Sequence, residues 1–175
     1  MWITTAAQLA EKLPMTVEEL AAVQAVADRY PMCITPYYLG LIDPNDPDDP
    51  IRKMAVPAPI EEEEGGSFDT SGEQSNTRVP DEEIAANFER VTGYIREHEE
   101  ITNVLLSGGD SFLNSNETIA RYLDALTPIG HLNYIRFGTR TPVTWPERID
   151  EALCETLARY TARKTIFVVT QFNHP

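Results

Sequence analysis

The second half of the chain carries hydrophobic residues at helical spacing. Between residues 83 and 97, Ile84, Phe88, Val91 and Ile95 follow one another at steps of four, three and four, which places them on one face of an amphipathic helix. Two later segments repeat this pattern, with Ile119, Tyr122, Leu123 and Leu126 in one and Ile149, Leu153, Leu157 and Tyr160 in the other. Each helix therefore has one apolar face to bury, as helices that cover a sheet do.

Three short apolar runs alternate with these helices. NVLLSG begins near residue 103, NYIRFGTRTP near 134 and KTIFVVTQF near 165, so the runs recur every 31 residues. A strand and a helix repeated in this order at this length predict parallel strands joined by crossover helices. The fold class is therefore α/β, and the pattern fits either a segment of a parallel barrel or a doubly wound sheet.

The first half of the chain is less regular. Residues 4–28 read as two short helices separated by Pro14, and Thr16 with Glu19 forms the pattern of a capping box. Thr35 and Pro36 fit the N-cap and first position of one helical turn. Residues 43–80 are acidic, rich in Pro and Gly and poor in apolar side chains, so they read as an irregular, solvated linker. We therefore divide the chain into a helical region at 1–42, the linker at 43–80 and an α/β region at 81–175.

The charge of the chain excludes some classes of partner. With 14 Lys and Arg against 28 Asp and Glu, the net charge is −14, which argues against nonspecific binding to nucleic acid or to anionic membranes. No stretch approaches the length of a membrane span, about 20 apolar residues, and the N-terminus lacks the pattern of a signal peptide. The two cysteines, Cys33 and Cys154, have no zinc or iron–sulfur spacing. A disulfide between them stays open, but two reduced thiols in a cytoplasmic protein are the better interpretation.

Polar residues follow each of the predicted strands. In parallel α/β folds the carboxyl ends of the strands lie at one edge of the sheet, where ligands bind. The candidate cofactor-binding residues end three successive strands: Ser107, Gly108, Gly109 and Asp110, then Arg140, then Gln171 and His174. The glycines would let a ligand approach the backbone, while Asp110 could take an ammonium group and Arg140 a carboxylate. Gln171 and His174 could hold a sugar or a base.

Each of these residues also has a structural interpretation. Two glycines after a strand often form a tight turn, and Arg140 could pair with an acidic neighbour. Asp110 could cap the next helix, although Asn114, Ser115 and Asn116 are better placed. His174 stands one residue before the end of the sequence, where chains fray. The coincidence at three successive strand ends favours ligand binding for the group.

Four segments together resemble the lysine 2,3-aminomutase family of radical S-adenosylmethionine enzymes. They are RYPMCITPYYLGLIDPNDPDDPIRKMAVP, NVLLSGGD, IRFGTRTPVTWPERI and TQFNHP, and the resemblance covers residues 2–64 and 81–175. It implies a partial (β/α) barrel that holds a [4Fe–4S] cluster, S-adenosylmethionine and pyridoxal phosphate. In such enzymes an adenosyl radical starts the migration of an amino group from C2 to C3 of an amino acid. The resemblance implies that Gly108 to Asp110 hold the methionyl end of S-adenosylmethionine, and it places Arg140 and His174 in family motifs.

The sequence also departs from the family pattern. Family members have a strand and a Cys-x3-Cys-x2-Cys loop before the helix that starts here near residue 81, and this chain has neither. Three thiolates from one loop are needed to hold the cluster, so we expect no metal-binding residue, no catalytic residue and at most a weak S-adenosylmethionine site. Lys53 and Lys164 lie in no pattern of a pyridoxal phosphate site, and the sequence stops at NHP, before the later strands of the family.

Three interpretations remain open at this point. The chain could be a truncated or internally deleted relative of an amino-acid isomerase, inactive by itself. It could be a binding module that keeps part of the S-adenosylmethionine pocket. It could also be a subunit or an oligomer whose barrel is completed by another chain, because the strands near 103 and 165 would both lie at edges of an open sheet.

Overall fold

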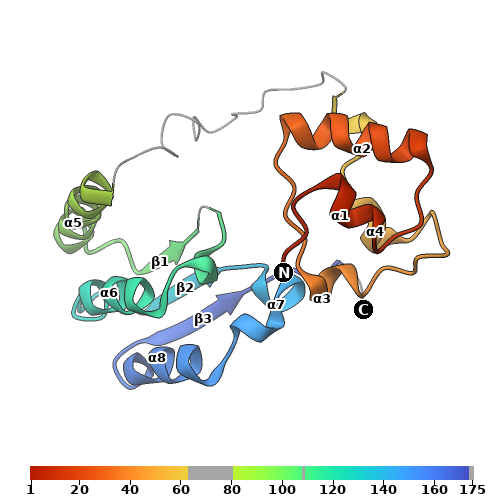
Figure 1. Cartoon of the computed structure of the whole chain (residues 1–175). Helices are drawn as coiled ribbons and strands as arrows, with labels where there is room; N and C mark the ends of the chain where they lie inside the picture. The colour runs from red at the N-terminus through yellow and green to blue at the C-terminus, as the bar shows by residue number, and fades with distance from the viewer. Residues whose placement is uncertain (63–80, 108, 174–175) are drawn as a thin grey trace. The chain divides into compact units, whose positions relative to one another are not determined.

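The chain is divided into two compact units in a computed structural model that describes residues 1–62, 81–107 and 109–173 (Figure 1). The first unit comprises the described residues of Met1–Gly66 together with Val143–Trp145 and Phe172–Pro175. The second unit comprises the described residues of Ser67–Pro142 and Pro146–Gln171. Each unit has a hydrophobic core of its own.

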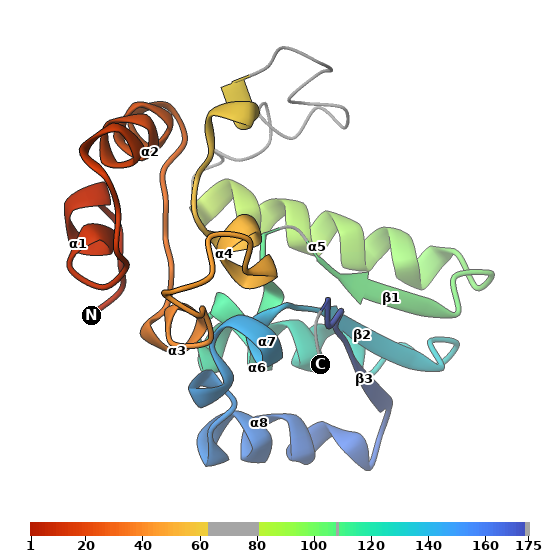
Figure 2. The same cartoon turned by 90° about the vertical axis from the view of Figure 1, so that its right-hand side faces the viewer.

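The second unit contains a sheet of three parallel strands, which Figure 2 shows side by side. The strands are β1 (Asn103–Leu106), β2 (Tyr134–Gly138) and β3 (Thr165–Val169), in that order. The helices are α5 (Asp81–Glu97), α6 (Asn116–Leu126) and α8 (Glu151–Thr161), with the short 3-10 turns η3 (Ser111–Leu113) and η4 (Pro146–Arg148) in the connections. The predicted α/β class and the parallel strands are confirmed. The sheet is open, with β1 and β3 at its edges, and is consistent with a segment of a barrel.

One face of this sheet is covered by helices at the middle strand, whereas Val168 of the edge strand β3, which lies on the same face, is 45% exposed. Ile135 and Phe137 of β2 have no exposed surface. They belong to a cluster of buried residues drawn mainly from α6 and α8: Ile119, Leu123, Leu126, Leu153 and Tyr160. The helical periodicity predicted these positions to be apolar and inward-facing, and the core confirms them. The prediction was wrong for Val91 and Ile149, which are 50% and 37% exposed; Ile149 precedes α8.

The opposite face leaves large apolar side chains exposed. Successive side chains of a strand point to opposite faces, so Leu105, Arg136 and Phe167, which are paired in register, lie together on the side away from Ile135. The exposed fractions of Leu105 and Phe167 are 46% and 47%. Tyr134 packs edge to face on Phe167, with ring centroids 5.5 Å apart. We call this surface the open face: Asn103, Leu105, Tyr134, Arg136, Gly138, Thr165, Phe167 and Val169.

The first unit is built from short helices: α1 (Ala6–Ala10), α2 (Val17–Arg29), α3 (Pro36–Leu39), α4 (Pro50–Ala55) and the 3-10 turn η1 (Pro59–Glu62). The predicted capping box is present, because the Glu19 N–H donates to Thr16 Oγ1 at 3.1 Å and the Thr16 N–H donates to Glu19 Oε2 at 2.7 Å. Thr35 caps α3, as predicted. The helix α4, which Asp49 caps, lies within the segment 43–80 that the composition predicted to be irregular.

A distant segment of the chain packs against the core of the first unit. Residues 143–145 follow β2 by only a few positions, in and just after the short helix α7 (Thr141–Thr144). Val143 packs against the core of the first unit, Thr35 Oγ1 donates to the Thr144 carbonyl, and the Trp2 and Trp145 rings meet edge to face at 5.1 Å. The first unit is therefore assembled from separated parts of the sequence.

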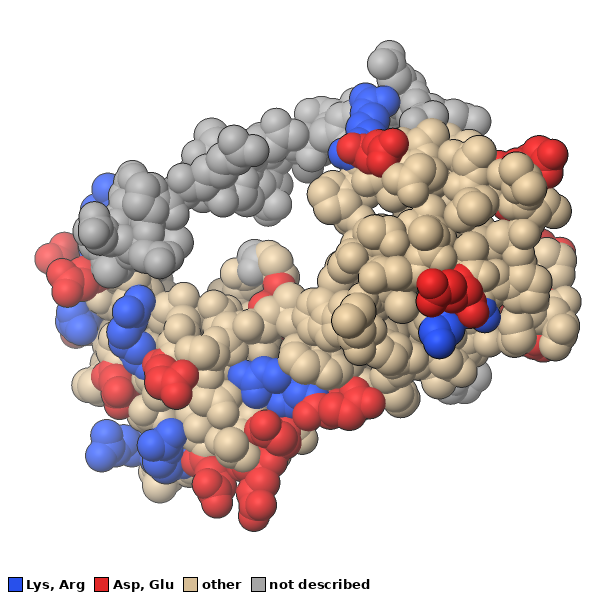
Figure 3. All heavy atoms as spheres, viewed as in Figure 1, with Lys and Arg blue, Asp and Glu red and all other residues tan. Residues whose placement is uncertain are grey.

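The surface carries charges of both signs. Figure 3 shows Asp and Glu side chains gathered on the lower part of the molecule, where Figure 1 draws α8, with Lys and Arg among them. Among the described residues, no helix combines the length and the apolar character that crossing a membrane requires.

Candidate functional site

The carboxyl ends of the three strands lie along one edge of the sheet because the strands are parallel and in register. The Thr139 N–H donates to the Val169 carbonyl at 3.0 Å, so the strand ladder continues one residue beyond β2. Ser107, Gly109 and Asp110 follow β1, Arg140 follows β2 and Gln171 follows β3. Gly108 and His174, the other two predicted site residues, lie outside the described residues.

Asp110 joins the loops that leave β1 and β2. Its Oδ1 accepts hydrogen bonds from the Phe112 N–H at 3.0 Å, from Thr139 Oγ1 at 2.5 Å and from Thr141 Oγ1 at 3.0 Å. Its Oδ2 accepts from the N–H groups of Arg140 at 2.6 Å and Thr141 at 3.2 Å. Four of these donors come from the loop after β2, about 30 positions along the chain. We call these five residues the Asp110 clamp.

The clamp keeps Asp110 ionised and occupies its oxygens. Partial burial acts to raise the pKa of Asp110, but the hydrogen bonds from Thr139, the Arg140 N–H, the Phe112 N–H and Thr141 outweigh burial and hold the pKa below its ordinary value. A carboxylate has about four lone-pair sites, and the clamp directs five donors at them. An ammonium group of a ligand would therefore have to displace one of the protein's own donors.

Both structural interpretations of the turn are partly realised. Asp110 caps the short η3 through the Phe112 N–H, while Ser115 caps α6 by accepting from the Thr118 N–H at 3.2 Å. Gly109 has a φ of +55°, a left-handed conformation that glycine adopts without steric cost. A Cβ added at Gly109 would meet no atom within 4 Å, and the residue is exposed. The backbone at Gly109 is thus open to an approaching ligand.

Further hydrogen bonds, which the sequence pattern did not predict, hold the same loops. Ser111 Oγ donates to the Gly138 carbonyl at 2.8 Å. Arg148 Nε donates to the Phe112 carbonyl at 3.0 Å, and its Nη2 donates to the Asn114 carbonyl at 2.9 Å. The signal that could have found the clamp is the segment Gly-Thr-Arg-Thr-Pro, in which two threonines flank Arg140 directly after a strand. Both threonines are buried, and Arg140 is exposed.

The structure brings some predicted site residues together and leaves others apart. Arg140 contacts Asp110 through its backbone, and Ser107 and Gly109 lie in the loop that Asp110 ends. Gln171 is exposed beyond β3, and no hydrogen bond joins it to the clamp among the residues described. Asn173, two positions on, groups with the first unit, where its Nδ2 lies 3.3 Å from Met54 Sδ.

The thiols of the chain do not fit an iron–sulfur cluster. The sequence has two cysteines, and Cys33 and Cys154 are both exposed and belong to different units. In the part of the chain that the structure describes, no three His, Cys, Asp or Glu side chains form a metal-binding group. A [4Fe–4S] cluster with one open iron needs three thiolates together, and this chain cannot supply them.

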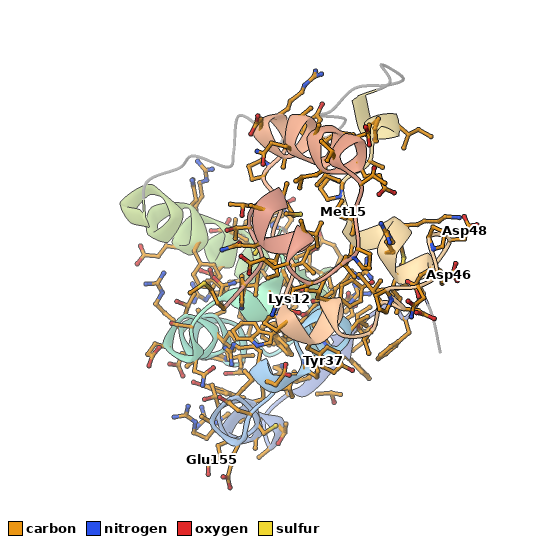
Figure 4. The ribbon with its side chains drawn as sticks, turned by 45° about the vertical axis from the view of Figure 1, so that its right-hand side comes forward. Lys12, Met15, Tyr37, Asp46, Asp48 and Glu155 are labelled. Atoms are coloured by element: carbon orange, nitrogen blue, oxygen red, sulfur yellow. The ribbon has the colours of Figure 1, made fainter. Side chains whose placement is uncertain are left out.

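The lysines do not fit a pyridoxal phosphate site. A lysine that forms a bond to this cofactor must be able to lose its proton. Lys53 Nζ pairs with Asp48 Oδ1 at 2.7 Å, and this hydrogen bond raises the pKa of Lys53. Lys164 donates to the carbonyls of Gly130 and Leu132. The remaining lysine, Lys12, is exposed just after α1 and is labelled in Figure 4.

Several curated proteins are similar to the chain over nearly all of its length. It is 32% identical to L-lysine 2,3-aminomutase of Clostridium subterminale over 99% of the chain and 50% of that protein. It is 32% identical to glutamate 2,3-aminomutase of Clostridioides difficile over 99% of the chain and 49% of that protein. It is 34% identical to a putative L-lysine 2,3-aminomutase of Aquifex aeolicus over 99% of the chain and 56% of that protein. No family model matches the chain.

The lengths of these matches show how much of each relative has a counterpart in this chain. The chain spans about half the length of the curated relatives it matches. The match to the Clostridium subterminale protein extends over 210 positions, whereas the chain has 175 residues. At least 35 residues of that protein, inside the matched range, therefore have no counterpart here.

Proposed function

The chain belongs to the lysine 2,3-aminomutase family, and from this premise we propose that it is an internally shortened relative that does not by itself catalyse the aminomutase reaction. The observation that carries the proposal is the thiol count: two cysteines, in different units, where a cluster needs three in one loop. The gap of at least 35 residues inside the matched range supports an internal loss. The family's S-adenosylmethionine chemistry depends on an electron from that cluster, so the radical has no source in this chain.

Anaerobic reconstitution with iron and sulfide tests the proposal directly. The 175-residue chain should keep only background iron and sulfide after desalting, and it should form no 3-amino acid from lysine or glutamate. The Clostridium subterminale enzyme, treated in parallel, serves as the positive control. Stoichiometric iron together with turnover would overturn the proposal.

A weak S-adenosylmethionine-binding module is a second candidate, favoured by the open backbone at Gly109. We expect binding no tighter than about millimolar, because a hydrogen bond to a charged group contributes about 1.5–3 kcal/mol and every 1.4 kcal/mol is about tenfold in affinity. Calorimetric titration of the chain beside Gly109→Val measures it. Saturable binding that the substitution abolishes would favour this candidate over an unused pocket, and micromolar binding would show that the pocket is less impaired than we expect.

A subunit completed by another chain is the third candidate, favoured by the edge strand β3. Four of its five residues are exposed, and none is charged. An uncharged apolar edge offers unpaired backbone groups to a further strand. Sedimentation of the chain alone and mixed with an intact aminomutase tests this candidate, which fails if the chain sediments as a monomer in both.

A further inference from the structure

Arg136 lies at the centre of the open face. It belongs to β2, the middle strand, and the register sets Leu105 on one side of it and Phe167 on the other. Both neighbours are about half exposed. No acidic residue occupies any of the positions that define this face. A guanidinium group thus stands in the middle of an apolar surface.

One edge of this guanidinium is only half satisfied. Nη2 donates to Asn103 Oδ1 at 2.6 Å, while Nε is shut off from solvent and has no hydrogen-bond partner in the described part of the chain. Nε and Nη2 present two parallel N–H groups, the arrangement that matches the two oxygens of a carboxylate. The single amide oxygen of Asn103 takes one of them. A buried N–H without an acceptor is uncommon and destabilising.

We propose that this edge of Arg136 binds the carboxylate of a small organic acid whose aliphatic part packs on Leu105 and Phe167. The carboxylate replaces the Asn103 amide oxygen, accepts from both Nε and Nη2, and so satisfies the nitrogen that is orphaned without it. Asn103 then acts as an internal placeholder that competes with the ligand. The apolar neighbours supply contact area, and the two-pronged contact supplies orientation, as in mostly apolar pockets with a few polar groups.

This site is separate from the Asp110 clamp, and the inference does not rest on the proposed function. It requires no cluster and no turnover. An amine of the same carbon chain has no group that Arg136 can bind. The site therefore discriminates between ligands by their charge and by the planar shape of the carboxylate.

Nuclear magnetic resonance of the Arg136 Nε–H tests the site in the full chain. The probe is hexanoate, with hexylamine as the control of equal chain length. The resonance, assigned by its loss in Arg136→Lys, should shift and saturate with hexanoate and stay unchanged with hexylamine. The absence of a saturable shift, or an equal response to hexylamine, would overturn the proposal.

Calorimetry measures the affinity for hexanoate in two variants with opposite expected effects. Opposite effects distinguish a change at the site from a loss of folding, which would weaken binding in both. Arg136→Lys keeps the charge but loses the two-pronged contact, so affinity should fall by about tenfold, the equivalent of about 1.4 kcal/mol. Asn103→Ala removes the competitor, so affinity should rise by about threefold or more, consistent with the modest net worth of one hydrogen bond. Arg163→Lys, at an exposed position after α8, is the matched control and should bind as the parent does. Weaker binding in Asn103→Ala would contradict the placeholder role even if Arg136→Lys fails to fold.

Discussion

Phe137 and Phe167 stand on opposite faces of the same three-stranded sheet. Phe137 has no exposed surface, lies among residues of α6 and α8, and has the Phe112 ring 5.4 Å away. Phe167 is 47% exposed and sits beside Arg136. The residue type and the strand geometry are the same, so the difference comes from the helices. The strand–helix repeat builds one core and leaves the second face to be used by something else.

The largest expected effect breaks the covered face. Phe137→Ala should lower the free energy of unfolding by about 3–5 kcal/mol, because it removes a buried ring and leaves a cavity. Since a domain of this kind is stable by about 5–15 kcal/mol, the variant should unfold at much lower urea. Phe167→Ala is the matched control on the open face and should cost no more than about 1 kcal/mol. Equal losses for the two variants would mean that both faces are equally packed.

A second, smaller effect concerns the Asp110 clamp. Asp110→Asn keeps one acceptor oxygen but places an amide NH₂ opposite the N–H and O–H donors of the clamp. We therefore expect the free energy of unfolding to fall by about 2 kcal/mol. Urea unfolding measures it, with Glu155→Gln, at an exposed position of α8, as an acidic control outside the clamp. A loss no larger than that of the control would show that the five hydrogen bonds are not made in solution.

The clamp should also make stability depend on pH. Because the pKa of Asp110 is lowered in the folded chain, its contribution is fully present above the unfolded value of about 3.9 and is lost as pH falls through the folded value. As the pH falls through this acidic range, the free energy of unfolding should therefore decrease more steeply for the parent than for Asp110→Asn. Parallel curves for the two proteins would contradict the lowered pKa.

The smallest effect on stability is expected on the open face. Val169→Lys places a charge at a position that is 46% exposed, at the end of the edge strand. Stability should change by less than about 1 kcal/mol, while self-association should fall because charged residues protect sheet edges. Light scattering against concentration measures it, with Glu155→Gln on α8 as the control, because it changes the net charge by the same one unit at an exposed position. Association reduced equally by both variants would indicate a charge effect alone.

The strand–helix repeat was predictable because its signals are local. Residues such as Leu123 and Leu153 recur at helical spacing, and each strand is a short apolar run, so element type and order follow from neighbours in sequence. The helix α4 was missed because Asp49 and Pro50 serve equally well in a turn and at a helix N-terminus. A helix of six residues carries too little periodicity to decide between them.

The clamp and the half-satisfied arginine were not predictable for a different reason. Asp110 and Thr139 are distant in sequence, and only the register of β1 on β2 brings them within 2.5 Å. Arg136 could be placed on a strand, but its unmatched Nε depends on how one neighbouring amide is oriented. The pattern of apolar and polar residues predicts which residues share an edge or a face of the sheet. It does not predict which polar groups lack a hydrogen-bond partner.

The position of residues 143–145 in the sequence sets the order in which the contacts of the first unit can form during synthesis. Thr35 and Trp2 are synthesised early. Their contacts, Thr144 and Trp145, are synthesised roughly 80 residues after the end of η1. At about 5–20 residues per second, the N-terminal unit waits several seconds for its last contacts, and β1, α6 and β2 are made in the meantime. Among the described residues, the buried core of the first unit comes from residues 3–42 alone, so the contacts with residues 143–145 are added to a unit whose core can form before they are made.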